Sequence, residues 1–185
     1  MKLNLQQKRP YKFLLDMERI KKIDVAKRQL DTAIIMFFEK KDPIAIHTVA
    51  CAAYDILRNL VGDKKVKELQ TLKDNSLISE KQKKDWYREL NRPQNFFKHA
   101  KKDPLETLDF QPQITEFFIG DACNLYRYLT KDFSSAMVVF STWYFMKNPN
   151  FLKSEEKRHL YKKGSQTMDI NNYSRFLGLI KSLKF

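Results

Sequence analysis

The sequence predicts an all-α protein, an antiparallel up-and-down helical bundle with additional helices towards the C-terminal end. Apolar residues recur at three- and four-residue steps along several segments, which is the period of one buried helix face. The 185 residues include only four glycines and six prolines, which is few for the many turns of an all-β fold. Fourteen phenylalanines and eight tyrosines supply bulky side chains for a core.

The chain has the length of a single domain. A domain of this size buries about 70% of the surface of its unfolded chain, so a core forms without disulfides or metals. We expect a basic N-terminal arm over residues 1–14 and one helical domain over 15–185. Within that domain, the bundle core spans about 17–147 and a C-terminal helical appendage spans about 150–185.

The first two helices are predicted to form a hairpin. A stripe of apolar residues predicts a helix over about 16–41. Asp42 and Pro43 then supply an N-cap and a first-turn residue for the next helix, which should end before Gly62. The connection is short, so the two helices should be antiparallel. The second helix is apolar on nearly every side, which indicates a central position.

The rest of the chain continues the helical pattern. We expect a short surface helix after Gly62, and extended chain after Pro104. A helix with Ser79 as its N-cap should break or restart at Asn91-Arg92-Pro93, because proline disrupts a helix interior. Three further helices are predicted over 113–130, 134–147 and 169–183.

The apolar run Ala136–Met146 is broader than one neighbouring helix would cover. We therefore expect it to contribute to a homodimer interface. It is also the longest apolar stretch of the sequence, and its eleven or so residues are about half of what a membrane-spanning helix needs. The N-terminal residues lack the apolar centre of a signal peptide. We expect a cytoplasmic protein without a membrane partner.

The formal net charge is +13, which favours a polyanionic partner such as RNA, DNA or an anionic membrane surface. The alternative is that the charge only keeps the protein soluble. Cys51 and Cys123 lie in apolar contexts, as buried thiols of a reducing compartment do. There is no CxxC pair for a zinc ribbon, no glycine-rich phosphate loop, and no cofactor is expected.

The segment Asn91–Pro104, reading NRPQNFFKHAKKDP, is the strongest candidate site. Histidine acts as an acid or base near neutral pH, and arginine binds phosphate and stabilises transition-state charge. Arg92 and His99 are therefore candidate catalytic residues for RNA cleavage without a metal. The candidate substrate-binding residues are Asn95, Lys98, Lys101 and Lys102.

This pattern resembles that of the HEPN superfamily (higher eukaryotes and prokaryotes nucleotide-binding), in which an arginine precedes a histidine by a few residues. Here six residues separate Arg92 from His99. The helical pair over 29–60 resembles the opening hairpin of such domains, and the resemblance covers about 17–130. It implies a commonly dimeric helical bundle that binds and in many members cleaves RNA. Pro93 departs from the family pattern. The NFFKHA segment also resembles that of uncharacterised bacterial proteins.

Alternatives remain at each candidate position. His99 is otherwise a partly buried histidine bonded to a backbone carbonyl, and the protein a non-enzymatic bundle that binds a nucleotide or a protein partner. His47 and Cys51 have the spacing of two metal ligands on a helix, but a hydrogen-bonded core histidine is favoured and no metal is expected. Trp86 and Tyr87 lie among cations, as in surfaces that bind single-stranded nucleic acid, although an amphipathic helix with two core aromatics has the same pattern.

Overall fold

The computed structural model describes residues 17–99 and 104–183, and the regular structure within these ranges is entirely helical. This confirms the predicted all-α class. The predicted arm over 1–14 lies outside the described residues. The helices are α1 (Lys22–Phe38), α2 (Pro43–Val61), α3 (Asp63–Leu69), α4 (Glu80–Lys98), α5 (Ile114–Thr130), α6 (Ser135–Lys147), a 3-10 turn η2 (Pro149–Phe151), α7 (Glu155–Thr167) and α8 (Tyr173–Ser182).

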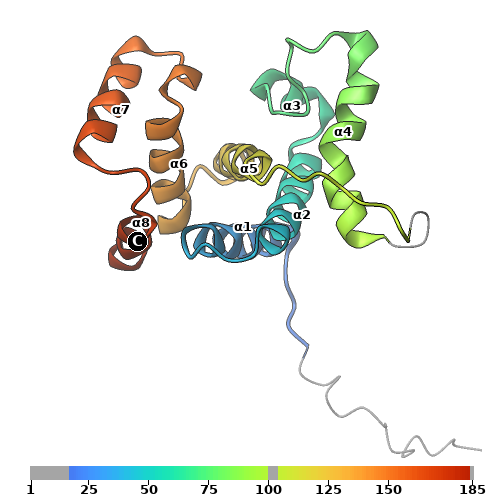
Figure 1. Ribbon diagram of the computed structural model, residues 1–185, viewed down its shortest axis with the longest axis horizontal. Coiled ribbons are helices and arrows are strands. Elements are labelled where there is room, and N and C mark those ends of the chain that lie inside the picture. Colours follow the sequence, from blue (N-terminus) through green and yellow to red (C-terminus); the bar gives the residue numbers. More distant parts are fainter. Residues whose placement is uncertain (1–16, 100–103, 184–185) are drawn as a thin grey trace, which may run out of the picture.

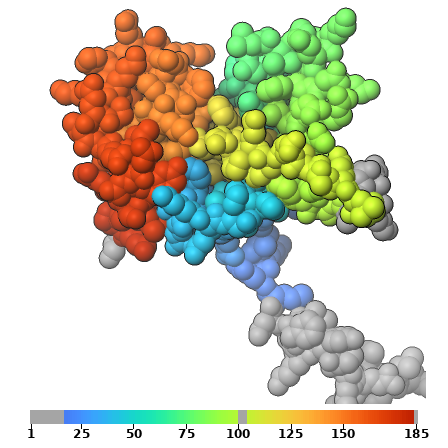
Figure 2. Space-filling model, viewed as in Figure 1, coloured from blue at the N-terminus to red at the C-terminus, as the bar shows by residue number. Residues whose placement is uncertain are grey.

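Figure 1 shows α5 near the middle of the view, between two groups of helices. α1 and α2 form the predicted hairpin, α5 packs on both, and α6 packs on α1 and α5. α3 and α4 contact α2 on one side, whereas α7 and α8 contact α6 on the other. Figure 2 shows a notch between these two groups of helices, with α5 at its floor. One apolar core runs from α1 to α8 and includes the buried side chains of Leu30, Phe118, Trp143 and Phe176.

The ends of α2 lie where local sequence signals place them. The Asp42 carboxylate accepts hydrogen bonds from the backbone N–H groups of Ile44 and Ala45, at 2.9 and 3.1 Å. Gly62 follows the last helical residue with a φ of 85°, a value that glycine adopts without steric cost. Both predicted boundaries of this helix are confirmed.

α2 is the central helix of the described structure. It packs between α1 and α5, and Tyr54 and Leu57 on it are fully buried. Among the helices of residues 17–99 and 104–183, it alone is long and apolar enough to cross a membrane by length and composition. Core helices of soluble proteins have the same properties.

The broad apolar surface of α6 is covered by other helices of the same chain. Val139, Phe140 and Trp143 are buried, and the surrounding contacts come from α1, α5, α7 and α8. The Trp143 indole N–H donates to the Ile170 carbonyl at 2.9 Å, which fixes the connection to α8 against α6. The feature that predicted a homodimer interface is therefore explained inside one chain, and dimerisation stays an untested prediction.

Two helix boundaries differ from those predicted, and one further helix was not predicted individually. α1 begins at Lys22 rather than near residue 16, and Ile20 is 49% exposed, because residues before Lys22 extend beyond the surface that buries the helix. α8 begins at Tyr173 rather than 169, where the Asn172 side chain caps it by accepting from the Arg175 N–H at 3.2 Å. α7 lies within the predicted C-terminal helical appendage over about 150–185, but its polar sequence did not indicate a separate helix, and it buries no residue in the described structure.

The predicted break at Pro93 is wrong, because α4 continues through it from Glu80 to Lys98. Proline inside a helix costs about 3 kcal/mol, since it removes one backbone hydrogen bond and crowds the preceding turn. Leu90 and Gln94 flank the proline on the same helix and are both buried. Their contacts with the body of the protein hold the helix continuous despite the local preference for a break.

We expect Pro93→Ala to raise the free energy of unfolding by about 1–3 kcal/mol, because alanine restores the N–H and suits a helix interior. Urea unfolding followed by circular dichroism measures this change. Lys81→Ala at an exposed position of α4 is the control and should change stability by less than about 0.5 kcal/mol. A less stable Pro93→Ala protein would contradict the prediction and would mean that contacts of the proline ring outweigh the missing bond.

Candidate nucleic-acid interface

The exposed side of α4 carries a row of basic and polar side chains. The helix begins at Glu80 and presents an outer face at every third or fourth residue. The acidic residues Asp85 and Glu89 lie along one edge of this face. We call the row the α4 basic strip; its members are all exposed and are Lys81, Lys84, Arg88, Arg92, Asn95 and His99.

Four of the predicted site residues lie on or beside this strip. Arg92, Asn95, Lys98 and His99 are exposed, so His99 is not the partly buried histidine of the alternative interpretation. His99 is the C-cap of α4, and its backbone N–H donates to the Asn95 carbonyl at 3.0 Å. The two other predicted binding residues, Lys101 and Lys102, lie outside the described residues.

Arg92 and His99 are seven residues apart, which is about two helical turns. They therefore lie on the same side of α4, separated by about 10 Å along the helix axis. The Arg92 guanidinium forms an ion pair with Glu106 at 3.0 Å, and about half of its side chain is exposed. Three pockets found in the described structure are lined by other residues. The Arg92–His99 pair stands on an open helix face.

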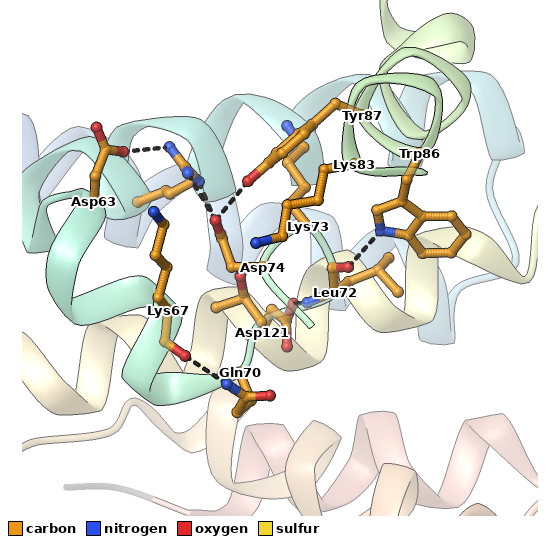
Figure 3. A network of polar contacts seen from close by, with 12 residues as sticks. Asp63, Lys67, Gln70, Leu72, Lys73, Asp74, Lys83, Trp86, Tyr87 and Asp121 are labelled. Carbon is orange, nitrogen blue, oxygen red and sulfur yellow. Dashed lines mark hydrogen bonds and ion pairs between the residues drawn. The ribbon is translucent and has the colours of Figure 1, made fainter. Parts of the chain in front are cut away.

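The inner side of α4 is anchored by polar contacts (Figure 3). The Trp86 indole N–H donates to the Leu72 carbonyl at 2.9 Å, and the Tyr87 hydroxyl donates to Asp74 at 2.5 Å. Both aromatic side chains thus point away from the basic strip. The amphipathic-helix interpretation is confirmed for Trp86, which packs against the core, whereas Tyr87 is half-buried and bonded to Asp74.

Asp74 is the centre of this network. Its side chain is 1% exposed, and it accepts hydrogen bonds from Arg58 at 3.1 and 3.2 Å and from the Thr71 hydroxyl at 2.9 Å. Burial tends to raise the pKa of Asp74, but the hydrogen bonds from Arg58, Tyr87 and Thr71 outweigh it, so the pKa lies below its ordinary value. The carboxylate joins the connection between α3 and α4 to both α2 and α4.

Asp121 on α5 binds the same connection from the opposite side. Its carboxylate accepts the Leu72 backbone N–H at 2.6 Å. Burial raises the pKa of Asp121 to about 7; the Leu72 hydrogen bond opposes this rise, and the nearby charge of Asp74 adds to it. Ionisation of Asp74 therefore stabilises the fold, whereas ionisation of Asp121 destabilises it.

A polar row on the otherwise apolar α2 faces this network. His47, Cys51, Asp55 and Arg58 follow one another at steps of four, four and three residues, which places them on one side of the helix. Asp55 accepts from Lys73 at 3.1 Å and from the Gln94 amide at 2.8 Å. Sequence patterns alone indicated His47 and Cys51 of this row, as possible metal ligands, and missed the polar interface. The spacing of the four residues is the sequence signal that could have indicated it.

His47 is a hydrogen-bonded core histidine, as the favoured interpretation held. It is fully buried, its Nδ1 lies 2.9 Å from the Thr115 hydroxyl, and its Nε2 lies 3.3 Å from the Cys51 sulfur. Burial lowers the pKa of His47 to about 4, with further lowering by the charges of Lys73 and Lys98. No group of three metal-ligating side chains occurs among the residues that the structure describes.

Comparison of the chain with protein-family models, with curated proteins and with solved structures found no match in any of the three. The resemblance to the HEPN superfamily therefore stays an untested prediction. The class of site is defined by geometry, as an exposed basic helix face anchored through a buried polar network.

We expect Asp74→Asn to lower the free energy of unfolding at pH 7 by about 2–4 kcal/mol, because the Arg58 charge loses its buried partner. The native pKa is below that of the unfolded chain, so the carboxylate stabilises the fold above about pH 4 and this contribution is lost at lower pH. The deficit of the variant should therefore shrink below about pH 4. Urea unfolding across pH measures it.

The matched substitution Asp121→Asn should behave in the opposite way. The native pKa of about 7 lies above the unfolded value of about 4, so ionisation of Asp121 reduces stability as the pH rises between these values. The variant should be more stable than the native protein at pH 8 and similar to it at pH 4. The same pH dependence in both aspartate variants would contradict the assignment of the two roles.

Proposed function

We propose that the protein binds RNA by contacting the phosphate backbone along the α4 basic strip. The observation that carries this proposal is the run of exposed Lys and Arg side chains on one face of a single helix, over about 17 Å from Lys81 to Arg92. Lys and Arg that neutralise phosphates release counterions from nucleic acid, which supplies most of the free energy of non-specific binding.

The strip suits the RNA backbone better than the bases. Trp86 and Tyr87 bond to Leu72 and Asp74 on the inner side of α4, away from the strip. The strip itself offers cations together with the Asn95 amide and the His99 imidazole. Arg88 is ion-paired with Asp85 and Glu89 at the edge of the strip, and both pairs are exposed. The amide and the imidazole bind hydroxyl groups, and the 2′-hydroxyl distinguishes RNA from DNA. Recognition of this kind depends little on base sequence.

The ion pair of Arg92 does not block this surface. Both Arg92 and Glu106 are more than one-third exposed, and exposed ion pairs contribute at most about 1 kcal/mol. A phosphate group binds arginine through two parallel hydrogen bonds and is a stronger partner than one carboxylate oxygen. RNA is therefore expected to displace Glu106 from Arg92.

Cleavage of the bound RNA is a second candidate function, favoured by the position of Arg92 and His99 on the same exposed side of α4. The imidazole takes the proton of a 2′-hydroxyl, or gives a proton to the leaving 5′-oxygen, while the 2′-oxygen attacks phosphorus and the bond to the 5′-oxygen breaks. The guanidinium stabilises the negative charge on the pentavalent phosphate. Neither role needs a metal ion.

RNA binding is tested by fluorescence anisotropy with single-stranded RNA across salt concentrations. With about four phosphate contacts, the slope of log K against log salt should be about −3. The variant with Lys84→Gln, Arg88→Gln and Arg92→Gln should bind at least about tenfold more weakly, with the slope reduced by about 2. Glu106→Gln should bind more tightly, because Arg92 loses its competing partner.

The matched control carries the same change in charge on α7: Lys157→Gln, Lys162→Gln and Lys163→Gln, all at exposed positions. It should bind RNA like the native protein. Equal weakening by the two triple variants would overturn the α4 proposal, since net charge alone would then explain binding. Equal affinity for DNA of the same sequence would overturn the assignment of RNA as the partner.

Cleavage is tested by incubating native protein with single-stranded RNA in EDTA, beside His99→Ala. We expect His99→Ala to lose at least about 100-fold in rate, whereas His159→Ala on the exposed side of α7 should cleave normally. Absence of cleavage by the native protein, or equal cleavage by native and His99→Ala protein, would remove the enzymatic role and leave the binding proposal to be judged by the anisotropy experiment.

A further inference from the structure

A pocket of about 410 Å³ lies where α3 and the residues after it meet α5. This volume falls within the range of small-molecule binding sites. The lining combines an apolar floor with hydrogen-bonding and cationic side chains on one face of α5. The lining residues that matter for the argument are Leu125, Asp121, Asn124, Arg127, Tyr128 and Lys131.

One end of this pocket is strongly cationic. The Lys131 and Lys65 ammonium groups lie 4.7 and 5.4 Å from the centre of the Tyr128 ring. Arg127 also lines the pocket from the last turn of α5, and its guanidinium lies 5.5 Å from the centre of the Phe133 ring. Lys131 also donates to the Tyr128 carbonyl at 2.9 Å, which is the usual role of a cation at a helix C-terminus. Lys65 is ion-paired with Glu68 and lies outside the pocket lining, so Arg127 and Lys131 are the cations that line this end.

The other end binds hydroxyl or amino groups. The Asp121 carboxylate uses one oxygen to accept the Leu72 N–H at 2.6 Å, and a carboxylate accepts several hydrogen bonds in total. Asn124, one turn further along α5, is exposed and offers both a donor and an acceptor. A ligand with hydroxyl groups would satisfy both side chains.

The two ends are arranged along a single helix face. Asp121, Asn124, Tyr128 and Lys131 follow one another at steps of three, four and three residues, which aligns them on one side of α5. Asp121 and Tyr128 are separated by about 10 Å along the axis. We propose that this pocket binds a small phosphorylated polyol such as a sugar phosphate, with its phosphate at Arg127 and Lys131 and its hydroxyl groups at Asp121 and Asn124.

The proposal is independent of RNA binding, because it uses side chains at α5 rather than on α4. It is tested by isothermal titration calorimetry of the full chain with ribose 5-phosphate, ribose and inorganic phosphate. Ribose 5-phosphate should bind with one-to-one stoichiometry, and inorganic phosphate at least about tenfold more weakly, since each lost charge-assisted hydrogen bond costs about a factor of ten. Ribose alone should give no measurable heat.

Substitutions test which residues bind the phosphate group and which bind the hydroxyl groups. Arg127→Gln with Lys131→Gln should weaken ribose 5-phosphate binding at least about tenfold. Asp121→Asn should weaken ribose 5-phosphate while leaving inorganic phosphate unchanged. The matched control is Lys162→Gln with Lys163→Gln on α7, which should bind normally. The α4 triple variant should also bind normally, which separates this site from the RNA-binding strip.

Nuclear magnetic resonance of the native protein locates the ligand without any substitution. Ribose 5-phosphate should shift the side-chain amide signals of Asn124 and the backbone signal of Leu72. The proposal would be overturned if ribose 5-phosphate did not bind, or if it bound no more tightly than inorganic phosphate. It would also be overturned if the Arg127/Lys131 variant and the Lys162/Lys163 control weakened binding equally, or if the signal shifts were confined to other helices.

Discussion

The buried carboxylate of Asp74 is the interaction on which the position of α4 depends. Residues 70–79 connect α3 to α4 without regular structure, so they do not hold α4 in place through helical hydrogen bonds. Asp74 instead bonds to Arg58 on α2, to Tyr87 on α4 and to Thr71 within the connection. Removing one partner of a buried ion pair leaves the other charge without compensation. A different position of α4 that separated Asp74 from Arg58 would therefore be unfavourable.

The polar row on α2 explains how a basic helix packs onto an apolar bundle. The faces of α2 towards α1 and α5 bury apolar side chains such as Ala50 and Leu57. The face towards α4 offers Asp55 to Gln94 and Arg58 to the α3–α4 connection. Hydrogen bonds are directional, so these pairs set the rotation of α4 about its own axis and direct Lys84, Arg88 and Arg92 towards solvent.

The positive charge of the protein is distributed among surfaces with different chemistry. On the α4 basic strip, the cations are exposed on an open helix face, which suits a long polyanion. Near Tyr128, two cations, Arg127 and Lys131, line one end of a pocket whose other end carries Asp121, which suits a small ligand with both an anionic group and hydroxyl groups. Net charge alone does not separate these two arrangements.

The sequence by itself determined the helical class and the helix ends that depend on local chemistry. Asp42, Pro43 and Gly62 delimit α2 because capping and proline geometry act over a few residues. Ser134 delimits α6 in the same way, since its hydroxyl accepts the Met137 N–H at 3.2 Å. The spacing from Arg92 to His99 likewise placed both residues on one side of a helix once that helix was continuous.

Only the tertiary structure decided whether that helix was continuous and which way it faced. Pro93 favours a break locally, and the inner-face contacts of α4 override this preference. The partners Arg58 and Asp74 are sixteen residues apart, and Leu72 and Asp121 are forty-nine apart, so no local pattern relates them. Contacts between distant residues form only when the chain is folded, because packing rather than sequence spacing brings these groups together.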